Sequence, residues 1–133
     1  PIHTWHGERV LDFDRRTSKI HGTIVHEPRL VRQGADWAEY IVGECEELYF
    51  SLRRLEFEKT IEDKTNGKFV VLTLVDGDKI RIRSKANPEY YFDAEFMDMT
   101  VVPAAMGEFV VENLGAEPIC VHKTTLKEGF ENE

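Results

Sequence analysis

The stretch from residue 69 to residue 84 constrains the fold of this chain more than any other. It reads FVVLTLV, then DGD, then KIRIRS: an apolar run, a tight turn and a strictly alternating run. Alternation with a period of two is typical of a β-strand, so we expect Ile80 and Ile82 to point to the interior. The apolar run predicts a strand covered on both faces, and the two runs together predict a β-hairpin.

Similar signals recur along the rest of the chain and predict an all-β protein. The segment EDKTNGK predicts a turn around Asn66 and Gly67. In LYFSLRRLEFE the apolar positions change parity near Arg53 and Arg54, which predicts a β-bulge or a bend there. Further strands are expected at 48–58, 96–103, 107–115 and 117–127. Six or more strands at spacings of about 10 residues indicate a β-sandwich or barrel.

The chain of 133 residues has the length of one domain. We expect a lead or connector segment with short strands at 1–38, a barrel at 39–127 and a frayed tail at 128–133. The sequence contains no long apolar run and no signal-peptide pattern, so no membrane association is expected. It does not begin with Met, which leaves open that it is one part of a longer protein.

The charge of the chain argues against some partners. Lys and Arg number 17 against 25 Asp and Glu, a formal net charge of −8, which disfavours nucleic acid and anionic membranes. The basic residues Lys79, Arg81 and Arg83 alternate on one strand and predict a solvated outer face, or alternatively a contact with a small anion. Cys45 and Cys120 belong to no CxxC pair, which predicts inert thiols in a reducing cytoplasm.

Three motifs carry a resemblance to a known family. They are a YF…L strand at 48–55, VLTLVDG at 71–77 and VPAAMGEF at 102–109. In these motifs the chain resembles the cupin superfamily, and more narrowly the C-terminal barrel of type I mannose-6-phosphate (phosphomannose) isomerases. The resemblance implies a cupin-type jelly-roll barrel preceded by an irregular lead segment.

The resemblance also indicates where a metal site would lie. In the isomerases, zinc is held in the catalytic barrel by a Gln, two His and a Glu, and a Q-x-H pair starts that site. This chain has no Q-x-H pair. The cupin ligand positions fall on Val70, between Asp63 and Asn66, and on Glu108 or Phe109, depending on the count. We therefore expect no metal, no cofactor and no catalytic residue here, with Glu108 at the rim and Phe109 as an apolar filler.

Three functions are consistent with these motifs and with the missing metal ligands. The sequence leaves open whether the chain is an enzyme. The first is a metal-free supporting barrel that packs against the catalytic barrel of a mannose-6-phosphate-isomerase-like protein. The second is a stand-alone cupin that binds a sugar, sugar phosphate or other small molecule through Arg54, Arg81, Tyr91 and Glu108. The third is a dimerisation module that uses the apolar strand at 69–75. Consecutive rings at 90–92 must expose some aromatic surface in any of these cases.

Overall fold

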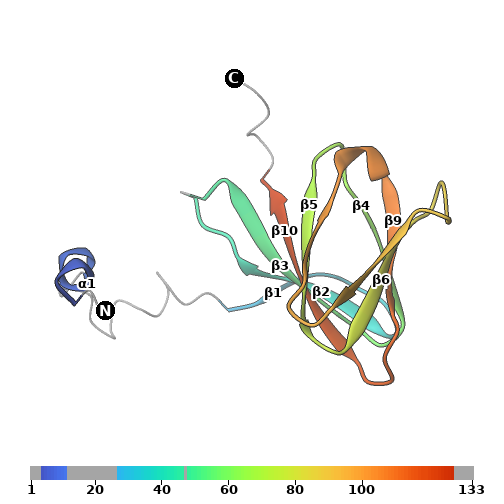
Figure 1. Ribbon diagram of the computed structural model, residues 1–133, viewed down its shortest axis with the longest axis horizontal. Helices are drawn as coiled ribbons and strands as arrows, with labels where there is room; N and C mark the ends of the chain where they lie inside the picture. The colour runs from blue at the N-terminus through green and yellow to red at the C-terminus, as the bar shows by residue number, and fades with distance from the viewer. Residues whose placement is uncertain (1–3, 12–26, 47, 128–133) are drawn as a thin grey trace.

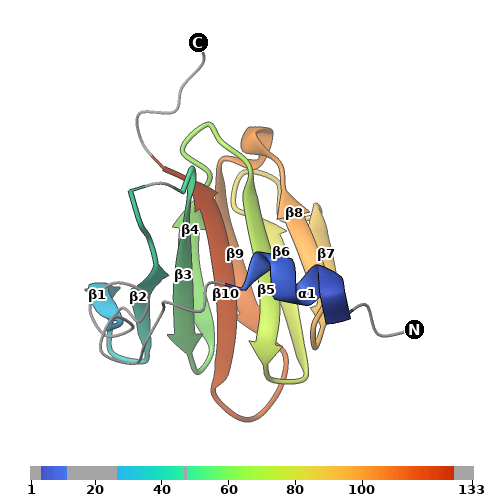
Figure 2. The ribbon, with the colours of Figure 1, turned by 90° about the vertical axis from the view of Figure 1, so that its left-hand side faces the viewer.

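The computed structural model describes residues 4–11, 27–46 and 48–127, and it confirms the all-β prediction. Two antiparallel sheets face each other, as Figures 1 and 2 show from two sides. The six-stranded sheet runs in the order β1 (Arg29–Gln33), β2 (Trp37–Gly43), β3 (Phe50–Phe57), β10 (Ile119–Leu126), β5 (Val70–Asp76), β8 (Met99–Val102). The four-stranded sheet runs β4 (Thr60–Lys64), β9 (Glu108–Asn113), β6 (Lys79–Ser84), β7 (Tyr91–Glu95).

The hydrophobic core lies between the two sheets. Ile80 and Ile82 are each 1% exposed, which confirms their predicted inward orientation. Phe109 is fully buried and is among the largest buried side chains, so it fills the interior as predicted. The core is completed by residues from both sheets: Leu55, Phe57, Ile61, Val70, Leu72, Leu74, Ala94, Val102, Val111, Ile119 and Val121.

The predicted hairpin at 69–84 is wrong, although both of its strands exist. β5 pairs with β10 and β8, whereas β6 pairs with β7 and β9, so the two strands lie in different sheets. Inward residues of both strands, such as Leu74 and Ile80, belong to one core. Two strands that each contribute an apolar face bury more surface across a core than edge to edge. The DGD turn, where Gly77 has a φ of 121°, therefore connects the two sheets.

The irregularity predicted near Arg53 lies on the neighbouring strand β2 and not on β3 itself. β3 pairs with β10 residue for residue, from Phe50 opposite Leu126 to Phe57 opposite Ile119. The irregularity lies on the neighbouring strand β2, between Ile41 and Gly43. The apolar positions of β3 change parity because its inward-facing residues change from apolar to polar along the strand.

Several segment boundaries differ from the sequence-based expectation. β1 pairs with β2, so one of the short strands expected in the segment 1–38 belongs to the six-stranded sheet. That segment also holds the short helix α1 (Thr4–Val10), which has no buried residue. The strand expected at 96–103 starts only at Met99, after Met97 with a φ of 67°. Residues 12–26 and the expected tail at 128–133 lie outside the described residues. No helix within the described ranges has the length and apolar character needed to cross a membrane.

Two turns meet at one end of the sandwich. The predicted turn at Asn66 and Gly67 is confirmed, with φ values of 52° and 76°. The segment after Pro103 forms the short 3-10 helix η1 (Ala104–Met106) and leads into β9. The Thr65 amide donates to the carbonyl of Gly107 (3.0 Å), and its hydroxyl donates to the carbonyl of Ala104 (2.8 Å). These bonds fix the Asn66 turn at the end of the sandwich where the candidate site lies.

Candidate functional site

The inner faces of β10 and β3 change from apolar to polar at the same level. Val121 lies opposite Leu55, and both are fully buried. One step further toward the same end, Lys123 lies opposite Arg53, and Ser51 follows on β3. Inward positions recur every second residue, so this switch is built into both strands. The interior is therefore a hydrophobic core at one end and a polar chamber at the other.

Two more strands supply carboxylates to the polar end. On β4 the buried Ile61 is followed two residues later by Asp63, whose side chain is 7% exposed. On β2 the inward residue is Glu39, which is 1% exposed. Carboxylates this deeply buried need cationic partners, because an unpaired buried charge is very costly.

A network of ion pairs supplies those partners. Lys123 Nζ lies 3.0 Å from Glu39 Oε1 and also contacts the Asp63 carboxylate. Arg53 donates through Nη1 to Glu39 Oε1 at 3.1 Å. Arg32 donates through Nε to the other oxygen of Glu39 and lies 3.4 Å from Asp63. Burial alone opposes ionisation of Glu39, but the charges of Lys123 and Arg32 outweigh it and hold its pKa at about 2.

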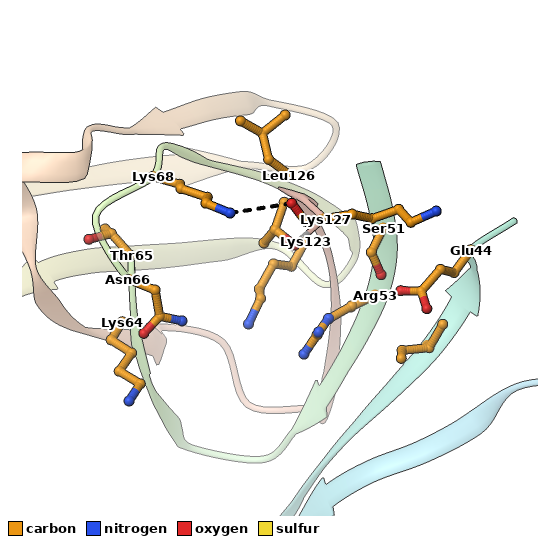
Figure 3. Close-up of a pocket in the computed structure, with 12 residues that line it drawn as sticks. Glu44, Ser51, Arg53, Lys64, Thr65, Asn66, Lys68, Lys123, Leu126 and Lys127 are labelled. Carbon is orange, nitrogen blue, oxygen red and sulfur yellow. Dashed lines mark hydrogen bonds between the residues drawn. The ribbon is translucent and has the colours of Figure 1, made fainter. Parts of the chain in front are cut away.

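A cavity of about 1110 Å³ adjoins this network and shares Arg53 and Lys123 with it. We call it the lumen cavity. Its lining residues are Ile41, Glu44, Ser51, Arg53, Lys64, Thr65, Asn66, Lys68, Lys123, Thr125, Leu126 and Lys127. Five of these side chains are cationic and only Glu44 is a carboxylate. In Figure 3 the basic ends of Lys64, Lys123 and Arg53 turn toward the same side of the cavity.

Two polar atoms at the wall of the lumen cavity are buried without a hydrogen-bond partner in the described structure. They are the hydroxyl oxygen of Ser51 and the Nε of Arg53. Ser51 is 2% exposed, so bulk water does not reach its side chain freely. Most buried polar side-chain atoms in proteins have a partner, so these two donors would be satisfied by a water or by a polar ligand that reaches them from the cavity.

At the edge of the lumen cavity, Lys68 and Lys127 form hydrogen bonds to backbone carbonyls. Lys68 Nζ donates to the backbone carbonyl of Lys127 at 3.3 Å (Figure 3). Lys127 Nζ donates in turn to the carbonyl of Cys45 at 2.8 Å. These bonds join the end of β10 to the loop after β2 and to the turn before β5, and so they hold the rim in shape.

A second cavity of about 360 Å³, the rim cavity, adjoins the lumen cavity and shares Arg53, Lys64, Asn66 and Lys123 with it. Glu108 lines this second cavity, and its side chain is 67% exposed. Its carboxylate lies 3.6 Å from Lys85, which also pairs with Glu62. The structure therefore places Glu108 at the outer rim of the chamber.

The other three ligand-binding candidates from the sequence lie on outer faces. Arg54 pairs with Glu56 at 2.9 Å on the outside of the six-stranded sheet. Arg81 binds Asp93 through two hydrogen bonds on the outside of the four-stranded sheet and stacks over Tyr91 at 4.2 Å. The structure thus brings Arg81 and Tyr91 together, but it brings neither of them to Arg54 or to the chamber.

The positions at which a cupin would hold its metal do not form a metal-binding set in this chain. Val70 and Phe109 are buried apolar residues of the core. Asp63 forms ion pairs with Lys123 and Arg32, and Glu108 forms one with Lys85. Within the described ranges, no cluster of three or more His, Cys, Asp or Glu side chains is arranged to hold a metal ion. Zinc and iron sites need three or four such donors, so these residues do not fit the metal that the fold family implies.

Except for Asp63, which stands at a cupin ligand position, the chamber residues were not identified as site residues in the sequence. The parity of the charged residues along their strands would have identified them as inward-facing. In ICVHKTT, Lys123 has the same parity as Ile119 and Val121. In SLRRLEF, Arg53 has the same parity as Leu55 and Phe57. A charge on the apolar parity of a strand indicates a polar position inside the fold.

Solved structures of other proteins share this architecture, although no similarity is found at the level of sequence families. No protein-family model matches the chain, and no curated protein matches its sequence. Solved structures do match: the cupin domain of Cnp3 from Schizosaccharomyces pombe aligns with a TM-score of 0.58 and 18% identity, over 78% of this chain and 72% of that one. The chain therefore has the cupin fold, as the resemblance in its sequence implied.

Mannose-6-phosphate isomerases are also among the matching structures. The enzyme from Bacillus subtilis aligns with a TM-score of 0.55 and 13% identity over 75% of this chain. A putative mannosephosphate isomerase from Archaeoglobus fulgidus aligns with a TM-score of 0.52 and 25% identity over 65% of this chain. The chain covers only 28% and 27% of these two proteins, so the likeness concerns a part of each of them.

Proposed function

We propose that this chain is a cupin that binds a small polar molecule inside its barrel. The observation that carries the proposal is the lumen cavity itself, whose lining residues include Ser51 and Arg53 with their buried, unpartnered donors Oγ and Nε. A buried polar group without a partner costs about 1–3 kcal/mol, and a bound molecule that accepts from both groups would recover that cost. A volume of about 1110 Å³ is ample for such a molecule.

The surrounding residues support binding by keeping these donors in place. Glu39 accepts from Arg53 Nη1, which holds the guanidinium while its Nε stays available. Glu39 is itself held by Lys123 and Arg32. Groups fixed in this way lose little freedom when a ligand arrives, which favours affinity. The proposal assigns binding only and includes no bond-making step.

A thermal-shift screen with a matched pair of variants tests this function. The panel holds neutral sugars and polyols, sugar phosphates and small carboxylic acids. We expect at least one compound to raise the melting temperature, and we expect Ser51→Ala to reduce that shift. Thr100→Val is the matched control, because Thr100 Oγ1 is also buried without a partner in the described structure but lines a different surface. No shift with any compound, or an equal loss in both variants, would refute the proposal.

A second function is favoured by a separate surface, an apolar groove of about 550 Å³ between β7 and β8, which we call the edge groove. β7 and β8 are the end strands of their sheets, and large apolar side chains on them are exposed: Tyr91 (53%), Phe92 (55%), Met99 (73%) and Val101 (61%). Exposed apolar patches on this scale often mark interfaces. We propose as the alternative function that this edge packs against another barrel, either the catalytic barrel of a longer isomerase-like protein or a second copy.

Light scattering distinguishes the forms of this alternative. A dimer that Phe92→Glu converts to a monomer would support a second copy as the occupant. A strict monomer at high concentration would refute the second copy. Both proposed functions are compatible with the reducing cytoplasm expected from the sequence, because Cys45 and Cys120 are free thiols.

A further inference from the structure

We infer that the molecule bound in the lumen cavity carries an anionic group, a phosphate or a carboxylate, which lies among Arg53, Lys64 and Ser51. This inference rests on the proposed function, since it names the chemical class of the ligand for the same site. It differs from the binding site expected from the sequence, because Arg54, Arg81 and Tyr91 lie outside this cavity.

The lining of the lumen cavity is predominantly cationic. Five cationic side chains and one carboxylate face the lumen cavity, in a chain whose net charge is −8. Acidic residues therefore predominate in the chain as a whole but not at this wall. A cavity lined mainly by one sign of charge attracts ligands of the opposite sign and repels those of the same sign. A cationic ligand is thus disfavoured.

The cations of the cavity wall differ in whether they already have a carboxylate partner. Lys123 is held between Glu39 and Asp63, so its charge is balanced within the network. Lys64 takes part in no ion pair that the described residues show, although it lines both the lumen cavity and the rim cavity. A neutral ligand would cover part of this wall and leave the charge of Lys64 without a counter-charge. An anion would supply one.

The donors of the cavity residues are of the type that binds oxyanions. Arg53 uses Nη1 to bind Glu39, and its Nε is buried without a partner in the described structure. Guanidinium groups bind carboxylate and phosphate oxygens strongly, and such charge-assisted bonds are about twice as strong as neutral ones. The Ser51 hydroxyl adds a neutral donor on the neighbouring inward position of β3. The amide of Asn66 lies on the same wall. This donor set suits an oxyanion.

Three ligands with one carbon skeleton and different charge test the inference: glucose, glucose 6-phosphate and gluconate. We expect calorimetric titration to show at least one of the two anions binding about tenfold or more tighter than glucose. The advantage of the anion should shrink as salt is added, since salt screens the attraction. Inorganic phosphate alone shows whether the anionic group suffices, and binding of phosphate would support the inference.

Two variants that remove one lysine each provide the matched comparison. Lys64→Gln removes an exposed cation of the cavity wall, so the fold should survive. It should weaken binding of the anion severalfold and leave binding of glucose unchanged. Lys59→Gln removes an equally exposed cation at the turn between β3 and β4 and should change neither affinity.

The possible outcomes separate the inference from the proposed function. Equal affinity for glucose and for both anions would overturn the inference and leave the proposed function standing. Anion binding that Lys64→Gln and Lys59→Gln weaken equally would also overturn it. If the phosphates and gluconate all fail while a neutral compound binds in a Ser51-dependent manner, the inference fails alone. If no compound of any charge binds, both fail.

Discussion

Replacing Glu39 by Gln tests how the polar chamber is held together. Glu39 is 1% exposed and shares its carboxylate among Lys123, Arg53 and Arg32. Its pKa falls from 4.5 to about 2, which corresponds to roughly 3 kcal/mol of stability at neutral pH. Removing one partner of a buried ion pair costs 3–5 kcal/mol in other proteins. We therefore expect Glu39→Gln to lower the free energy of unfolding by about 3 kcal/mol at pH 7.

The pH dependence of this loss gives a sharper test. The pKa of Glu39 is lower in the folded than in the unfolded chain, so its contribution is complete above about pH 4.5 and disappears as the pH falls toward 2. The difference between the wild type and Glu39→Gln, measured by urea unfolding, should shrink to about 2 kcal/mol near pH 3.5. Glu56→Gln, which removes a partly exposed partner of Arg54, is the control and should have little effect at either pH.

A double-mutant cycle assigns the loss to the ion pair itself. Lys123→Met alone leaves Glu39 and Asp63 with less compensating charge, and the double variant removes one charge of each sign. We expect a coupling energy of at least about 1 kcal/mol, with the double variant more stable than the sum of the single losses predicts. A cost below about 1 kcal/mol for Glu39→Gln, without pH dependence, would refute the view that this carboxylate organises the chamber.

Three further predictions concern the rest of the barrel. Phe109→Ala should lower the free energy of unfolding by about 3–5 kcal/mol in urea, because Phe109 is fully buried in the core; a loss below about 1 kcal/mol would contradict this. Gly77→Ala should lower the melting temperature by several degrees, because the φ of 121° strains any other residue and the added Cβ would lie 2.4 Å from Ile119; an unchanged melting temperature would contradict the geometry. Burial, and then the charge of Glu56, raise the pKa of the Cys120 thiol to about 11, so it should react with iodoacetamide at pH 8 far more slowly in the folded than in the urea-unfolded chain.

The strands of this fold were predictable because their signal is local. The alternation in KIRIRS placed Ile80 and Ile82 correctly, and the turn at Asn66 and Gly67 followed from turn chemistry. The partners of each strand were not predictable in the same way. The short DGD connection looks like that of a hairpin, yet it joins two sheets. Which edge a strand pairs with depends on how the whole core is buried, and no local pattern carries that information.

The candidate site was less predictable than the fold. Glu108 was found through the family motif and lies at the rim. The residues of the chamber itself come from four strands and meet only after both sheets have formed: Glu39, Arg53, Asp63 and Lys123. Each of them is charged, and a charged residue read alone is expected on the surface. Arg54 was chosen where its neighbour Arg53 points inward, since one residue along a strand reverses the direction of the side chain.

The buried charges of the polar chamber also help to fix the alignment of β10 against β3. A slip of one residue would turn the apolar side chains outward, and hydrophobicity alone prevents it. A slip of two residues keeps every apolar side chain inward, so hydrophobicity barely opposes it. Such a slip would move Lys123 to the level of Leu55 or Ser51 and away from its place opposite Arg53, pulling its ammonium out of reach of Glu39. We expect that a barrel with an all-apolar interior at this level would accept the shifted pairing more readily, so the buried charges select one strand alignment during folding.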